Sequence, residues 1–498
     1  MVPFLTPPCK TALNCAVYFE SPSGDPVVRL FRLIKMVSPF LFLLYLFASA
    51  PPIFAQKAEL TLLIKMIPAQ EEWFVRNVLK PFEREYRADI RIEHFSDYDE
   101  LDKMTRENRN VDVVKVPMDR AATFHEKDYI TPLSDLMAPE QVARVRNDFI
   151  IPPLAMSGDT LLYIPRKLET RILVYRISKV QEAATRYREF LPEIDSALKS
   201  LQLPGLPDRY VLESDPNQWD YYDVLVAGYT WLKVYKEGRI GHRGKNYGGT
   251  FLRVVDRAFQ LGAIRGELPY LNSNPVSEAF AWEWLYARMK LIHPRMYKDG
   301  WTGEDLWKAF GDDRIFLAFL TQLDCFFLLG TGENGLNGFL KNPDDIEFSV
   351  MPLAASLTGR DFMMANRNIT TGGWFWAVSR TSVHKNLALK LIQYMTSEET
   401  QKKEFEAFGV LSSRKTLLKE NKDEHYLKRW RNRMLQTSAR QLQLNRTTQL
   451  PTFRDMDKLQ SAYLTLLQDL CQNPDQFRSI EDVMKSISVH DSAAPKVE

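Results

Sequence analysis

The feature that most constrains the fold is a strict alternation of strand and helix patterns near the start of the folded region. Residues 59–66 (ELTLLIKM) are typical of a buried strand, and a helix with an apolar face follows to about Tyr86. Residues 89–95 alternate as a second strand, residues 101–108 form a polar helix pattern, and residues 111–116 are a third strand. This order is typical of a parallel sheet covered by helices. The sequence therefore predicts the α/β fold class.

A second informative segment spans residues 370–413. A small polar turn with two glycines leads into an apolar and aromatic strand at residues 374–379. Thr396 and Glu399 have the spacing of a capping box, which predicts the start of a further helix, and Gly409 stands where a C-terminal glycine belongs. Between the strand and this second helix lies an amphipathic helix, whose apolar face carries Leu387, Leu391, Ile392 and Met395.

This segment resembles the carbohydrate-type extracellular solute-binding proteins of bacterial ABC importers, the maltose-binding-protein-like group. In that family a Gly-Gly-Trp-like turn opens onto the ligand cleft, and the next helix ends in a Thr-Ser-Glu-Glu-like junction. The Asp-Val-Val pattern at residues 112–114 and the Thr-Pro-Leu turn at residues 131–133 also match. One departure is Arg176, which follows Tyr175 where the family has Asn; this weakens the transfer of any ligand role to Arg176 and leaves a ligand with anionic groups open.

The resemblance implies a two-lobed periplasmic binding protein fold of type II, with discontinuous lobes, hinge crossings and a ligand cleft between the lobes. Two short strands, at residues 161–165 and 172–175, flank a basic link, Arg166-Lys167, at the first crossing. The expected division of the chain is residues 56–170 for the first part of lobe one, 171–355 for the first part of lobe two, 356–368 for a hinge crossing, 369–414 for the second part of lobe one, and 415–498 for C-terminal helices of lobe two.

The function implied is capture of a solute, foremost a sugar or oligosaccharide, and its delivery to the permease subunits of an ABC importer. The partner's ATPase would supply the energy, so the chain needs no P-loop and is not expected to be an enzyme. The alternatives that stay open are a sensor of the same fold for a membrane receptor, a binder of a metal or anionic solute, and an exported enzyme. A monomer without a cofactor is expected.

The N-terminal region, residues 1–55, has the pattern of an export signal. Residues 37–47 form an apolar run of signal-peptide length that is too short to span a bilayer. Arg29, Arg32 and Lys35 would form its basic region if translation starts near residue 27, and a long authentic extension is the alternative. Cleavage after Ala55 would leave a periplasmic protein without a lipid anchor, because no Cys ends the apolar run. The net charge of +2 gives no case for binding nucleic acid or an anionic membrane.

Signals for other chemistry are weaker. Residues 330–335 match GxGxxG, but Asn342-Pro343 would end the helix that a dinucleotide site needs, so a surface loop is favoured. The seven His residues have no metal-ligand spacing, and the pair Tyr221-Tyr222 is more often a packing feature than an iron site. Cys325 and Cys471 are interpreted as buried thiols rather than a disulfide.

Candidate ligand-binding residues fall into two groups. Aromatic rings on loops and strand ends can stack on sugar faces, and polar side chains at the carboxyl ends of strands line the ligand sites of α/β sheets. The aromatic group and its neighbours are Gly372, Gly373, Trp374, Trp219, Asp220, Tyr221 and Trp301. The polar group consists of Gln70, Glu71, Ser96, Tyr98, Asp119, Gln322 and Asp324. Core packing is an equal alternative for Trp219, and since Trp376 shares the strand face of Trp374, one of those two rings is expected to be core.

Overall fold

The computed structural model describes residues 57–107, 110–330, 338–340, 342–359, 366–445, 453 and 456–493. Residues 58–498 form one compact unit, and of the preceding unit only Lys57 is described. The predicted signal region at residues 1–55 and most of the GxGxxG segment therefore lie outside the described residues.

The first lobe is built on a six-stranded sheet. Its strands are β1 (Ala58–Ile64), β2 (Ala88–His94), β3 (Val113–Pro117), β4 (Ile130–Thr131), β7 (Ile164–Glu169) and β12 (Gly372–Ser379). The order is β2-β1-β3-β12-β4, and β7 also pairs with β12. Strands β2 and β3 both run parallel to β1, whereas β12 is antiparallel to β3 and to β7. The three predicted parallel strands are thus confirmed, each within two residues of its expected ends.

Helices cover both faces of this sheet. They are α2 (Pro68–Phe74), the π-helical turn η1 (Val75–Leu79), α3 (Lys80–Tyr86), α4 (Tyr98–Glu107), α5 (Ala121–Glu126), α6 (Pro139–Asp148), α15 (Lys385–Met395) and α16 (Glu398–Phe408). On one face Leu62 packs with Phe82 and Leu391, and on the other face Val114 packs with Phe124. Burial of these apolar side chains is the main stabilising term for the lobe.

The second lobe has a smaller, mixed sheet with strand order β11-β8-β10-β9. The strands are β8 (Arg171–Arg176), β9 (Ile240–Gly241), β10 (Leu317–Thr321) and β11 (Ile346–Ser349). Strand β10 is parallel to β9 and antiparallel to β8. A separate two-stranded hairpin, β5 (Met156–Ser157) and β6 (Thr160–Leu161), belongs instead to the first lobe, where Leu161 is part of the core around Leu62.

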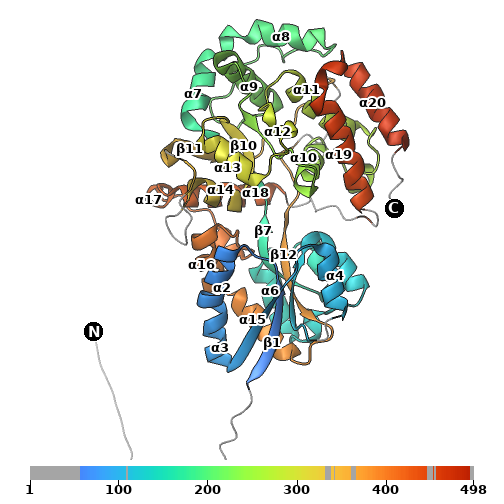
Figure 1. Cartoon of the computed structure of the whole chain (residues 1–498). Coiled ribbons are helices and arrows are strands. Elements are labelled where there is room, and N and C mark those ends of the chain that lie inside the picture. The colour runs from blue at the N-terminus through green and yellow to red at the C-terminus, as the bar shows by residue number, and fades with distance from the viewer. Residues whose placement is uncertain are drawn as a thin grey trace, which may run out of the picture. The chain divides into compact units, whose positions relative to one another are not determined.

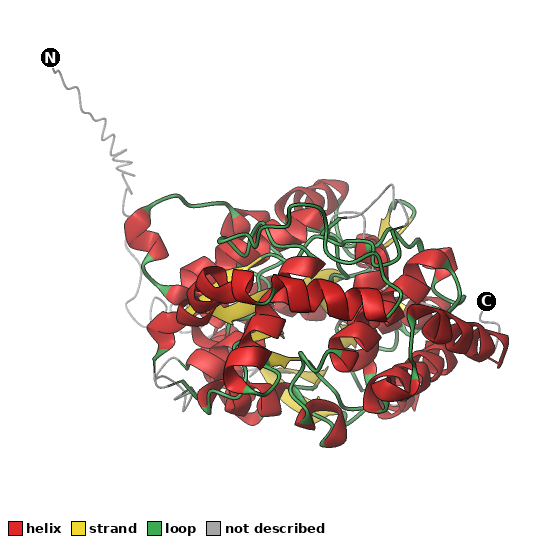
Figure 2. Cartoon of the chain, turned by 90° about the horizontal axis from the view of Figure 1, so that it is seen from above, coloured by secondary structure: helices red, strands yellow, loops and turns green. Residues whose placement is uncertain are grey.

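Most of the second lobe is helical. Its helices are α7 (Ile177–Arg186), α8 (Leu191–Ser200), α9 (Tyr221–Tyr235), α10 (Gly248–Gln260), α11 (Asn274–Arg288), α12 (Arg295–Lys298), α13 (Gly303–Gly311), α14 (Gln322–Leu329), α17 (Glu424–Leu427), α18 (Trp430–Leu444), α19 (Met456–Gln472) and α20 (Ile480–Ala493). In Figure 2 the strands (yellow) lie inside a surround of helices (red). Cys325 and Cys471 are free, buried thiols, as expected.

Two local predictions need correction. The N-cap of α16 is Ser397, whose Oγ accepts from Thr400 N at 3.2 Å, because Ser397 has an extended backbone while the Thr396 hydroxyl still donates to Ile392 O in the preceding helix. The basic pair Arg166-Lys167 is not a link between strands but lies within β7, which continues to Glu169. Gly409, in contrast, has the predicted left-handed conformation, with φ of 67°.

The chain crosses between the lobes at Thr170, the single residue between β7 and β8. In Figure 1, β7 and its partner β12 lie where the two lobes are joined. Asn445, at the end of α18, ties this crossing to the returning one, since its Nδ2 donates to Thr170 Oγ1 at 3.0 Å and to Thr371 Oγ1 at 3.3 Å. Asp256 of α10 accepts from Thr370 N at 2.9 Å and pairs with Arg171. The two crossings are therefore fastened side by side to the second lobe.

The described part of the expected hinge crossing, residues 356–368, still contacts the second lobe. Glu278 of α11 accepts hydrogen bonds from Thr358 N and Thr358 Oγ1, and Asn366 N donates to Gln260 O of α10. We therefore propose that the return crossing consists of residues 369–371.

The glycine pair at the start of β12 allows a direct test of local geometry. Gly373 has φ of 139°, and a Cβ there would collide with the Lys167 carbonyl oxygen, so Gly373→Ala should lower the free energy of unfolding by at least about 2 kcal/mol. Gly372→Ala is the matched control, because its Cβ would meet only Glu169 Cβ at 4.0 Å, and its effect should stay below about 0.5 kcal/mol. Urea unfolding of both variants measures the difference, and equal effects would contradict this account.

Candidate functional site

Polar and aromatic side chains lie together at one edge of the first-lobe sheet, because of the directions in which its strands run. Strands β1, β2, β3 and β7 all end at this edge, and the antiparallel β12 begins there. The residues at these ends are Lys65, Ser96, Asp119, Glu169 and Trp374. Ligand sites of α/β sheets form at such carboxyl ends.

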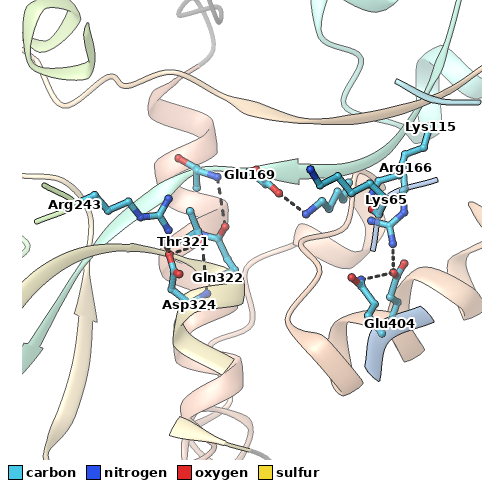
Figure 3. A network of polar contacts seen from close by, with 12 residues as sticks. Lys65, Lys115, Arg166, Glu169, Arg243, Thr321, Gln322, Asp324 and Glu404 are labelled. Carbon is cyan, nitrogen blue, oxygen red and sulfur yellow. Dashed lines mark hydrogen bonds and ion pairs between the residues drawn. The ribbon is translucent and has the colours of Figure 1, made fainter. Parts of the chain in front are cut away.

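The second lobe presents a corresponding edge. Arg243 follows β9, Thr321 ends β10, and β8 begins at Arg171. Because Thr170 alone joins Glu169 to Arg171, the two edges face each other across the crossing. Figure 3 shows Glu169 between Arg243 on one side and the basic groups Lys115 and Arg166 on the other.

Glu169 is the carboxylate at the centre of this arrangement. Its side chain is 38% exposed and forms an ion pair with Lys167 Nζ. Burial alone would raise its pKa, but the ammonium of Lys167, followed by Lys115 and Arg243, lowers the pKa overall. Glu169 is thus an ionised acceptor that responds to cations from both lobes.

Trp374 lies beside a buried cation. The Lys115 Nζ is 4.2 Å from the centroid of the Trp374 ring and donates to the Lys65 carbonyl oxygen. Burial, followed by repulsion from Arg166 and Lys167, holds the pKa of Lys115 well below its usual value. The indole itself is half-buried, with Phe95 at a centroid distance of 6.4 Å. It is therefore fixed in position while part of its surface remains accessible, unlike Trp376, which is fully buried.

A second group at this edge consists of Tyr98, Asp119 and Arg120. The Arg120 guanidinium lies 5.1 Å from the centroid of the half-buried Tyr98 ring. Burial raises the pKa of the Asp119 carboxyl, and the adjacent Arg120 partly offsets this shift. Ser96 is exposed, and its carbonyl oxygen accepts from Lys65 Nζ. The Ser96 hydroxyl donates to Glu100 Oε2 at 2.6 Å, so it already has a protein partner. Tyr98 and Asp119 thus add an aromatic ring and a carboxyl to this edge of the sheet.

In the second lobe Asp324 orients Arg243. Its carboxylate accepts from Arg243 Nη2 at 2.5 Å and from Thr321 N at 3.0 Å, and it also accepts from Trp307 Nε1 at 3.2 Å. Asp324 is 4% exposed, so it is saturated by protein donors. The predicted residue therefore positions a cation instead of facing solvent itself.

Three other polar candidates serve the protein's own structure. Gln70 is buried and donates to Glu404 at 2.9 Å, and Glu71 bonds His94 Nε2 at 2.8 Å. Gln322 is buried at the hinge, where its Nε2 donates to Ser438 Oγ at 2.9 Å. None of the three joins the groups around Trp374.

Four candidates lie within the second lobe and have structural roles. Trp219 is fully buried, and Asp220 caps α9 by accepting from Tyr222 N at 2.8 Å. Tyr221 is buried and donates to Gln260 Oε1 at 2.7 Å. Trp301 is buried against His293. Their side chains pack the core or cap a helix, so they do not belong to the candidate site. Arg176 is likewise buried, 2.7 Å from Asp313.

The sequence interpretation missed Lys65, Lys115, Glu169 and Arg243. Lys65 and Lys115 interrupt apolar strands near their carboxyl ends, which is a signal visible in the sequence. Glu169 could be found only once the direction and true end of β7 were known.

The lobes are not packed continuously against each other. A cavity of about 670 Å³ separates residues 149–154 of the first lobe from α18 and η8 (Lys415–Leu418), with Met118, Thr371 and Asn445 in its wall. This space leaves room for one lobe to move relative to the other about the crossings.

Two other kinds of site are absent from the part of the chain that the structure describes. No group of three or more His, Cys, Asp or Glu side chains there could hold a metal ion. Among the same residues, no helix has the length and apolar character needed to cross a membrane.

The profile of the bacterial extracellular solute-binding proteins matches residues 77–428. The chain belongs to this family. Two-lobed solute-binding proteins are also its structural neighbours, and this solute-binding protein shares their fold. A sequence search of curated proteins found no relative.

Three solved structures illustrate the likeness. Maltose-bound MalE3 of T. maritima has a TM-score of 0.59 and 14% identity, with 88% of this chain and 99% of that chain covered. The cyclic alpha-maltosyl-1,6-maltose binding protein of Arthrobacter globiformis has a TM-score of 0.61 and 10% identity, with 88% and 98% covered. The ABC substrate-binding protein Lmo0181 of Listeria monocytogenes, in complex with cycloalternan, has a TM-score of 0.60 and 13% identity, with 88% and 99% covered.

Two carboxylates, Glu404 and Glu169, pair with neighbouring basic residues of β7, and removing the charge of each should change the stability of the solute-binding protein by a different amount. Glu404 and its partner Arg166 are each 2% exposed, so Glu404→Gln would leave a buried guanidinium uncompensated and cost about 3–5 kcal/mol of unfolding free energy. Glu169→Gln removes a partly exposed, solvent-screened pair and should cost about 1 kcal/mol or less. Chemical denaturation of both variants distinguishes them, and a larger loss for Glu169→Gln would show that its role is structural.

Proposed function

We propose that this protein captures a carbohydrate between its two lobes. The observation that carries the proposal is the half-buried Trp374 ring, held by Lys115 and Gly373 at an edge where both lobes place polar groups. An indole face suits the C–H face of a sugar ring, and such aromatic contacts contribute on the order of 1 kcal/mol beyond the burial of apolar area.

The surrounding groups suit sugar hydroxyls. Glu169 and Asp119 are acceptors, and Lys167 and Arg243 are donors with fixed positions. A ligand that contacts Trp374 in the first lobe and Arg243 in the second would favour the closed arrangement, because only that arrangement permits both sets of contacts. Periplasmic binding proteins close around their ligands by a hinge motion of this kind.

The closed, loaded protein would then deliver its sugar to the membrane permease of an ABC importer. The energy for transport comes from that partner's ATPase, so the protein itself performs no catalysis. We expect it to act as a monomer. The apolar run at residues 37–47 acts as the core of an export signal, and cleavage after Ala55 gives a mature periplasmic protein that begins at Gln56 without a lipid anchor.

Binding measurements with a set of neutral oligosaccharides, monosaccharides and sugar acids test the ligand class. Calorimetric titration should identify a sugar that binds the native protein, and Trp374→Ala should weaken its affinity at least about tenfold. Tyr229→Ala is the control, because this half-buried aromatic residue lies on α9 and its hydroxyl contacts Glu193 instead of the candidate site.

Two outcomes would contradict the proposal. Equal weakening by Trp374→Ala and Tyr229→Ala would show that Trp374 acts through stability, not through ligand contact. Binding of an inorganic anion or metal in the absence of any sugar affinity would replace the carbohydrate with another solute while leaving the fold unchanged.

Export can be tested separately. After expression in a Gram-negative host, N-terminal sequencing of the periplasmic protein should give Gln56 as the first residue, and labelled fatty acid should not be incorporated. Recovery of an uncleaved chain in the cytoplasm would overturn the signal-peptide assignment.

A further inference from the structure

A small cavity in the second lobe has an unusual lining. It lies where α9, α10 and α11 meet β8 and β10, and its volume is about 20 Å³. Such a volume accommodates one water molecule or one small ion. Four of its lining residues, Arg253, Asp256, Arg257 and Gln260, lie on one face of α10, three or four residues apart.

Three lining residues have a nitrogen without a protein partner among the described residues. They are His242 at Nε2, Arg253 at Nε and Arg257 at Nη1. Their exposed fractions are 2%, 8% and 5%, so bulk water does not solvate these groups. A buried guanidinium N–H that lacks an acceptor is costly, which calls for an acceptor inside the cavity.

The charges around the cavity do not balance. Arg253 and Arg257 share one carboxylate, Glu283, with contacts of 2.9 and 3.0 Å. Arg171 forms an ion pair with Asp256, whose carboxylate is also occupied by the amide and hydroxyl of Thr370.

His242 adds no further positive charge to this imbalance. Burial, followed by repulsion from Arg253 and Arg257, holds the pKa of His242 well below its usual value, so this ring is neutral. The three guanidinium groups and two carboxylates therefore leave one positive charge in excess.

We propose that this cavity binds a monatomic anion of the halide class, with chloride as its natural occupant. A chloride accepts hydrogen bonds from several donors at once and compensates the excess charge. A water molecule would accept from two donors but would bring two hydrogens of its own into a cavity whose one carboxylate, Asp256, already accepts from Thr370 and pairs with Arg171. The His242 ring, stacked on Phe319 at 4.6 Å, would present an Nε2–H donor to the same ion.

The bound anion would act on the hinge through α10. The helix that supplies Arg253 and Arg257 to the cavity also supplies Asp256, which fastens Thr370 and Arg171 at the crossings. Neutralising the excess charge would stabilise this helix in the position that the hinge requires. The site is distinct from the proposed sugar site, because Arg171 alone among its lining residues was placed at the two facing edges.

The first experiment compares salts at matched ionic strength. The melting temperature of the purified protein should rise saturably, by about 2–4 °C, in sodium chloride or bromide relative to sodium gluconate. Arg257→Met should abolish the difference, whereas Arg288→Met, which removes a surface arginine paired with Asp475, should retain it.

The second experiment does not depend on a variant. Crystals of the native protein grown with sodium bromide should give an anomalous difference peak inside the cavity. A halide-specific rise in melting temperature together with this peak supports the proposal. Each remaining result overturns it: water alone in the cavity, a halide effect with the peak elsewhere, or a peak without any halide-specific rise, which would indicate binding at crystal concentration only.

Discussion

The arrangement of the molecule depends on how the chain passes between its lobes. Thr170 is the only residue between β7 and β8, so the carboxyl edge of one sheet is brought directly opposite the edge of the other. Asn445 and Asp256 then fasten the two crossings to the second lobe through buried hydrogen bonds. A shift at this point would move the Glu169 side chain relative to Arg243, and it would therefore change any contact that a solute makes with both lobes.

Several basic side chains lie close together near the carboxyl edge of the first-lobe sheet, and the fold must stabilise their charges. Lys115 is 3% exposed, and Arg166 and Lys167 lie close enough to depress its pKa. Placing cations in such a position is unfavourable unless acceptors are nearby, and here they are the Lys65 carbonyl oxygen, Glu404 and Glu169. The benefit is a set of donors whose positions are fixed before a ligand arrives, which lowers the entropic cost of binding.

The sequence predicts the parts of this structure that rest on local pattern. Apolar runs define β1 and β3, and Gly409 marks a helix end through its own backbone preference. The position of Glu169 could not be predicted from the sequence, because it follows from pairing between β7 and β12, which are remote in sequence. Trp219 was predicted as a ligand-binding candidate but is fully buried. A tryptophan in an irregular stretch gives no local signal of whether tertiary packing will bury it.

Helix α10 shows why charge patterns are the hardest part of a sequence to interpret. Arg253, Asp256 and Arg257 have the spacing of charged residues on a solvent-exposed helix face. Ion pairs on such a face contribute little to stability. Tertiary packing instead places that face inside the second lobe. There an unpaired guanidinium N–H is unfavourable, and so is a net positive charge without a counter-ion. Local sequence thus specifies that the helix forms, but burial determines whether its charges are solvated by water or require a counter-ion. Because Asp256 of the same face reaches Thr370, the electrostatic balance of this interior and the geometry of the hinge are coupled through one rigid element.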